Sequence, residues 1–265
     1  MKASAALQRK FFRGKQAAGQ IIDAVGRGDF RQATEYVGRV CVLAVGAAFP
    51  KVLGKRELPN GVEAEGFDRQ YGVETSEPVR VTEMELDGAA KTVQASYYQP
   101  SSPELLRGIM RELKELNVEF EQCNFVDVGS GKGLVLLVAS EHPFRRVMGI
   151  EFAANLHRAA ASNIEKFKSP LKRCPTLESV CADATKYEFP AEPTVFYLFN
   201  PFGEEILNGF LDNVERGWRA HQQPFYLVYV EPLFSDAIER RGTFQKIKEV
   251  EGQISQSYKI YKAVG

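Results

Sequence analysis

Short runs rich in apolar residues alternate with amphipathic segments along the second half of this 265-residue chain. Such runs are typical of parallel strands buried on both faces, and the segments between them have the 3.6-residue apolar period of helices. The predicted strands cover residues 125–128, 147–151, 179–184, 194–200, 225–230, 244–250 and 258–263, and the predicted helices cover 132–141, 154–167 and 203–219. This alternation predicts an α/β fold with a mostly parallel sheet.

The first 119 residues have a different pattern. Residues 1 to about 48 have helix-like apolar positions interleaved with basic ones, whereas 51–96 are polar, rich in Gly and Glu, and predicted to be irregular. A helix is expected from Pro103 to about Leu116, because Ser102 is a suitable N-cap and proline favours the first helical position. We divide the chain into a basic helical extension (1–56), a lid or connector with a pre-core helix (57–119) and a core (120–265).

The most distinctive segment is a glycine-rich turn between the first strand and the first helix of the core. Gly129, Gly131 and Gly133 follow the apolar strand, and glycine permits a sharp turn and the close approach of a ligand to the backbone. The helix that follows offers unpaired N–H groups at its start. Asp127 lies at the junction of strand and turn, where a buried carboxylate needs a cationic or hydrogen-bonding partner.

Polar residues follow the next three predicted strands. Glu151 ends the second strand about twenty residues beyond the turn, where α/β folds place a ribose, and its carboxylate can accept from both ribose hydroxyls. Asp183 ends the third strand and is expected to hold an adenine amino group, and Asn200 ends the fourth. Together these strand ends predict a nucleoside site; a parallel sheet with chance acids is the alternative.

Composition limits the partners without naming one. The 34 basic and 34 acidic residues balance, so the whole chain has no basic field for nucleic acid, although residues 1–56 hold about eleven Lys and Arg against about three acids. No run reaches the ~18 apolar residues of a membrane span. Four cysteines without C-x-x-C spacing indicate a reduced, cytoplasmic protein without metal or disulfide. The basic start also fits an organellar transit peptide, but a basic helix of the mature protein is our preferred interpretation.

The segment Asp127-Val-Gly-Ser-Gly-Lys-Gly133 resembles motif I of the class I S-adenosylmethionine (SAM) methyltransferases. This resemblance implies a Rossmann-like sheet that is mostly parallel with an antiparallel final strand, and it implies SAM as the cofactor. Ser130 joins the three glycines in the expected cofactor site. Phe152 and Ala184, which follow the two acids, are expected in the same site.

A second resemblance covers roughly residues 97 to 202. The chain is similar here to the non-SET histone lysine methyltransferases and to related bacterial and mitochondrial lysine methyltransferases. The shared order is a Tyr-x-Pro-Ser segment, a helix, the glycine turn and then Gly-Ile-Glu. The resemblance implies that Tyr98, Pro100 and Ser101 close over the methionine end of SAM. The alternative is that this segment only caps a helix.

Asn200-Pro201-Phe202 resembles the (D/N)-P-P-(Y/F) motif of enzymes that methylate amino nitrogens on adenine or glutamine, although only one proline is present. In those enzymes the amide accepts from the target NH₂ and the aromatic ring stacks on it. We therefore assign Asn200 and Phe202 as catalytic residues; a strand end turned by proline is the alternative. The resulting hypothesis is methyl transfer to an amine, with a protein lysine first. Transfer to a nucleic-acid amino group, with the basic N-terminus holding phosphates, and a non-catalytic SAM-binding scaffold are the rivals.

Overall fold

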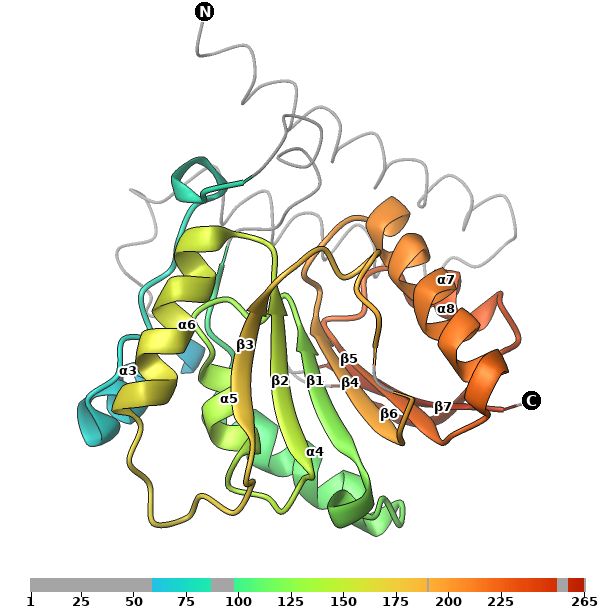
Figure 1. The fold of residues 1–265 in the computed structure, drawn as a ribbon, viewed down its shortest axis with the longest axis horizontal. Coiled ribbons are helices and arrows are strands. Elements are labelled where there is room, and N and C mark those ends of the chain that lie inside the picture. The colour runs from blue at the N-terminus through green and yellow to red at the C-terminus, as the bar shows by residue number, and fades with distance from the viewer. Residues whose placement is uncertain (1–58, 87–97, 190, 252–256, 265) are drawn as a thin grey trace, which may run out of the picture. The chain divides into compact units, whose positions relative to one another are not determined.

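The computed structural model describes residues 59–86, 98–189, 191–251 and 257–264 (Figure 1). The chain divides into two compact units, residues 1–57 and 58–265, and the described residues all belong to the second. The helical extension predicted for residues 1–56 lies outside the described residues.

One seven-stranded sheet forms the centre of the second unit. Its strands are β1 (Asn124–Val128), β2 (Arg146–Glu151), β3 (Leu177–Cys181), β4 (Thr194–Phe199), β5 (Phe225–Val230), β6 (Phe244–Val250) and β7 (Tyr258–Ala263). They lie in the order β3-β2-β1-β4-β5-β7-β6, with β1 to β5 parallel and β7 antiparallel to both of its neighbours. The predicted fold class is thereby confirmed as far as the sheet defines it: a Rossmann-like α/β fold whose sheet is mostly parallel and ends in antiparallel strands.

Helices cover both faces of the sheet (Figure 1). They are α3 (Pro59–Tyr71), α4 (Pro103–Glu115), α5 (Leu134–Ala139), α6 (Ala154–Lys166), α7 (Glu204–His221) and α8 (Ser235–Glu239), with short 3₁₀ turns at Val81–Glu83 and Phe120–Gln122. Phe125 of β1 packs in the core cluster of α3, α4 and α5, whereas Val126 and Val128 pack with α7 and α8. Both faces of β1 are therefore buried, which explains why apolar residues of this strand point to both sides. No helix in the described ranges is long and apolar enough to cross a bilayer.

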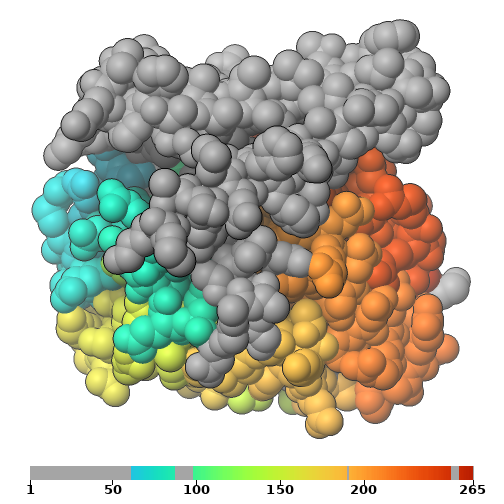
Figure 2. Space-filling view, turned by 90° about the horizontal axis from the view of Figure 1, so that it is seen from above, coloured from blue at the N-terminus to red at the C-terminus, as the bar shows by residue number. Residues whose placement is uncertain are grey.

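Residues 59–71 form helix α3, so the prediction of an irregular segment across 51–96 is wrong there. Phe67 is buried, and the rings of Phe67 and Tyr71 lie 5.9 and 4.9 Å from the ring of Phe167, which follows α6. Figure 2 shows α3 and the segment after it, in blue to cyan, on the opposite side of the molecule from α7, in orange. Tertiary packing of a few aromatic rings stabilises this helix, although its sequence is polar on average and contains two glycines.

Short polar side chains set the ends of two elements. The third strand ends at Cys181 and not at residue 184 as predicted, because Asp183 Oδ1 accepts hydrogen bonds from the N–H (3.1 Å) and hydroxyl (2.7 Å) of Thr185 and closes a turn. Helix α4 begins where predicted, with the Ser102 hydroxyl as N-cap accepting from the Leu105 N–H at 3.0 Å.

Candidate functional site

The glycine-rich turn lies at the carboxyl ends of β1 and β2. Gly129, Gly131 and Gly133 have φ values of +81°, +54° and +87°, in the left-handed region that L side chains disfavour. The N–H groups of Gly129 and Ser130 both donate to the Ile150 carbonyl, at 2.8 and 3.2 Å. These hydrogen bonds fix the turn against the end of β2.

Two neighbouring segments approach the turn so closely that a side chain would not fit. A Cβ atom on Gly129 would lie 2.6 Å from Cβ of Pro201, which follows β4. A Cβ atom on Gly131 would lie 2.2 Å from two ring carbons of Tyr98. The structure therefore places the predicted covering segment and the end of β4 directly against the turn.

Glu151, at the end of β2, binds the turn through its carboxylate. Its Oε2 accepts from the Gly131 N–H and its Oε1 from the Ala153 N–H, each at 2.7 Å. Burial raises the pKa of this carboxyl, and the backbone hydrogen bonds from residues 131, 152 and 153 oppose that rise. Each carboxylate oxygen has a second lone pair, so Glu151 retains capacity to accept from a ligand.

Asp127, the penultimate residue of β1, is 2 % exposed. Its register partners are Gly149 on β2 and Tyr197 on β4. Burial first, and then the nearby charge of Glu151, raise the pKa of Asp127 well above its ordinary value. Among the described residues, no lysine or arginine forms an ion pair with Asp127 or Glu151. The two acids thus form a buried site that favours a cationic ligand.

Residues 98–102 cover this acidic site from the side of α3. The Tyr98 hydroxyl donates to the Thr75 carbonyl at 2.6 Å, and burial with the charges of three nearby acids raises the pKa of Tyr98. The Ser101 and Tyr197 hydroxyls lie 3.2 Å apart, so Ser101 is hydrogen-bonded to the register partner of Asp127. Thr75 in turn donates to Asp68 of α3 at 2.6 Å. Residues 98–102 are therefore connected to α3 by a chain of hydrogen bonds through Thr75.

Two strand ends at the same edge have unusual backbone geometry. Asn200 after β4 and Glu231 after β5 have φ values of +38° and +49°. The Tyr229 hydroxyl donates to Asn200 Oδ1 at 3.2 Å. Non-glycine residues in this region are strained, and such residues cluster at functional sites. Sequence reasoning missed Glu231, although an acid directly before Pro232 at the end of a strand follows the same pattern as Glu151 and Asn200.

The remaining predicted residues lie at the margin of this cluster. Phe152, directly after Glu151, is half-buried, and Asp183 lies two residues beyond the end of β3 in its own turn. Ala184 and Phe202 pack in the core cluster on the α7 face, where the Phe202 ring lies 6.4 Å from that of Phe210. The structure therefore brings together Tyr98, Ser101, Asp127, the turn, Glu151 and the Asn200–Pro201 segment more closely than the other predicted residues.

No protein-family model and no curated protein matches the chain in sequence. In structure it is similar to a protein of Pyrococcus horikoshii OT3, at 15% identity and a TM-score of 0.45 over 61% of this chain and 89% of that chain. It is also similar to the magnesium protoporphyrin IX methyltransferase of Synechocystis PCC 6803, solved with bound SAM, at 10% identity and a TM-score of 0.45 over 61% and 78%. A ribosomal-protein methylase of Lactobacillus delbrueckii subsp. bulgaricus gives 13% identity and a TM-score of 0.42 over 60% and 77%.

Asp127→Asn is expected to stabilise the ligand-free protein more at pH 8 than at pH 5, because the amide cannot ionise in the buried site. The folded-state pKa of Asp127 is raised. Its contribution to stability is therefore full below the unfolded pKa of about 3.9 and is lost as the pH rises through the folded pKa. Urea unfolding at pH 5 and pH 8 measures the effect. Asp212→Asn, at an exposed acid of α7, is the control, and a wild-type pH dependence in Asp127→Asn would contradict the prediction.

Proposed function

We propose that this protein is a SAM-dependent methyltransferase that transfers a methyl group to an amine. The observation that carries the proposal is the buried pair Asp127 and Glu151 beside the glycine turn of a class I methyltransferase sheet. This pair has no cationic partner among the described residues, and SAM carries both a sulfonium and an ammonium charge. A cationic nucleoside ligand supplies the charge that the buried acids require.

In this proposal each strand end holds one part of SAM. The turn (Gly129, Ser130, Gly131 and Gly133) and Asp127 hold the methionine part, Glu151 accepts from the ribose hydroxyls, and Phe152, Asp183 and Ala184 surround the adenine. Tyr98 and Ser101 close over the methionine end, supported by the contacts of Tyr98 with Gly131 and of Ser101 with Tyr197. Glu151 keeps its backbone hydrogen bonds while it accepts from the ribose, because each oxygen has two lone pairs.

Bound SAM supplies an electrophilic methyl group, so the protein has mainly to orient the acceptor and exclude water. Asn200 lies beyond the carboxyl end of β4, at the edge where α/β sheets bind ligands. Its amide oxygen accepts from the amine of the acceptor, and Phe202 forms an apolar wall. We propose a protein lysine as the acceptor, deprotonated on entry, so that no dedicated general base is needed.

Isothermal titration with SAM, followed by transfer of labelled methyl groups into whole-cell lysate, tests the proposal. A methyltransferase binds SAM and labels macromolecules. If digestion with a protease releases the label, the acceptor is a protein. If digestion with a nuclease releases it, the nucleic-acid rival is supported. SAM binding without transfer identifies a scaffold, and absence of SAM binding rejects the proposal.

Asn200→Gly is expected to reduce the rate of methyl transfer at least about tenfold while SAM affinity changes by less than about threefold, because the lost hydrogen bond acts on the acceptor. Glycine removes the amide without opposing the φ of +38°. Asn117→Gly is the matched control, since Asn117 also has a positive φ, +59°, but lies at the exposed end of α4. A parallel fall of rate and affinity would assign Asn200 to the cofactor, and an unchanged rate would make it only a strand terminator.

A further inference from the structure

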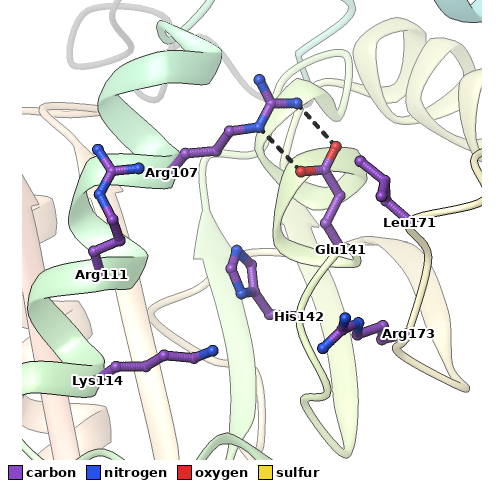
Figure 3. A pocket seen from close by; sticks show the side chains of 7 residues that line it. All are labelled: Arg107, Arg111, Lys114, Glu141, His142, Leu171 and Arg173. Carbon is purple, nitrogen blue, oxygen red and sulfur yellow. Dashed lines mark hydrogen bonds and ion pairs between the residues drawn. The ribbon is translucent and has the colours of Figure 1, made fainter.

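A pocket with a volume of about 400 Å³ lies away from the acidic site (Figure 3). Its lining comes from three segments: Arg107, Arg111 and Lys114 of α4, Glu141 and His142 after α5, and Leu171 and Arg173 in the loop before β3. The last two segments lead into the amino ends of β2 and β3. The pocket is therefore at the edge of the sheet opposite Glu151 and Asn200.

The charges around this pocket do not balance. Arg107 is neutralised, because its Nε and Nη2 donate to the two Glu141 oxygens at 3.1 and 2.9 Å, as Figure 3 shows. Arg111, Lys114 and Arg173 form no ion pair with any described residue. Three cations from two separate segments therefore line one concave site without a counter-ion from the described part of the chain.

The imidazole of His142 lies among these groups and is half-buried. The pKa of His142 is lowered to about 4, mainly by burial. The positive charges of Lys114, Arg173 and Arg107 also lower it, and only the negative charge of Glu141 opposes them. The ring is therefore neutral at pH 7 and has one N–H to donate. It packs edge-on against the Phe120 ring at 5.6 Å, and Lys114 Nζ lies 5.6 Å from the centre of the same ring. Phe120 thus holds both groups at the pocket.

We propose that this pocket binds a small phosphorylated molecule, with its phosphate oxygens between Arg111, Lys114 and Arg173. Guanidinium and ammonium groups are the usual ligands of phosphate, and a charge of −2 to −3 compensates the three cations. The volume exceeds the need of one phosphate ion and falls within the range of small-molecule sites, roughly 300–1,000 Å³. Leu171, which is 52 % exposed, offers an apolar contact to the organic part of the ligand.

Titration of the full-length protein with inorganic phosphate, pyrophosphate and adenosine monophosphate tests this site, with the His142 ring signals followed by NMR. Saturable binding of at least one of these anions is expected. The bound anion should raise the pKa of His142 by at least about one unit, because it offsets the charges of Lys114, Arg173 and Arg107. The contribution of His142 to binding should therefore appear only as the pH falls through this raised pKa.

Arg111→Ala and Arg173→Ala are each expected to weaken anion binding at least about tenfold, as the loss of a charge-assisted contact does. Arg69→Ala, at an exposed arginine of α3, is the matched control and should bind like wild type. No saturable binding by any of the three anions, or equal affinity in Arg111→Ala and Arg69→Ala, would overturn the proposal. SAM binding is measured separately, so failure here leaves the methyltransferase proposal unaffected.

Discussion

Gly129→Ala is expected to destabilise the fold by about 2–4 kcal/mol and to weaken SAM binding at least about tenfold. The φ of +81° costs an L side chain about 1–2 kcal/mol. In addition, the new methyl group would lie 2.6 Å from Cβ of Pro201, so the turn or the end of β4 must move, and overpacking of this kind costs about 1–3 kcal/mol. Urea unfolding and isothermal titration with SAM measure the two effects.

Gly242→Ala separates the backbone strain from the contact with Pro201. Gly242 has a similar φ, +72°, but no atom of a described residue other than its chain neighbours lies within 4 Å of a Cβ built there. This variant should lose only the backbone contribution, about 1–2 kcal/mol, and keep wild-type SAM affinity. If both variants lost the same stability, the close approach of Pro201 would have no energetic role. If Gly129→Ala kept wild-type SAM affinity, the turn would not belong to the cofactor site.

Glu151→Ala is expected to lose about 2–4 kcal/mol of stability as well as SAM affinity, at least about tenfold. The carboxylate accepts from the Gly131 and Ala153 N–H groups, and alanine would leave both donors buried without this acceptor. The loss of stability follows from the structure, whereas the sequence alone predicts only the loss of affinity. Thermal unfolding and titration with SAM at a temperature where the variant is folded distinguish the two.

Glu178→Ala is the control for the second prediction. Glu178 lies on the neighbouring strand β3 and forms a partly exposed ion pair with Arg146, so its removal should cost no more than about 1 kcal/mol and leave SAM affinity unchanged. Wild-type affinity in Glu151→Ala would remove Glu151 from the ribose site. Wild-type stability would mean that water replaces the carboxylate as acceptor for the two backbone groups.

The sequence predicts the centre of the sheet well because β2, β4 and β5 are mainly apolar runs that end at a charged residue or before proline. It also predicts that Asp127, Glu151 and Asn200 share one edge, since the carboxyl ends of parallel strands lie together. The sequence does not predict which other segments contact this edge of the sheet. The contacts of Gly129 with Pro201 and of Gly131 with Tyr98 join segments far apart in the chain, and no local pattern encodes them.

The wrong or missing predictions also concern features that depend on contacts beyond the local sequence. Helix α3 is stabilised by packing on Phe167, about a hundred residues away, and its local sequence is a poor helix signal. The end of the third strand depends on whether Asp183 extends the strand or hydrogen-bonds to Thr185, and both are compatible with its sequence. The unusual backbone of Glu231 was missed because a positive φ at a glutamate follows from the surrounding structure and not from the residue type.

The position of Tyr98 has a kinetic consequence. Its ring lies directly on the Gly131 backbone, and its hydroxyl is bound to the Thr75 carbonyl at 2.6 Å, so a ligand that reaches this backbone must first displace the ring. The order of events is then opening of the ring, entry of the ligand and closure. Ligand association would then consist of a slow opening of the Tyr98 ring followed by rapid binding of the ligand. At high ligand concentration the observed association rate would reach a plateau equal to the rate of ring opening.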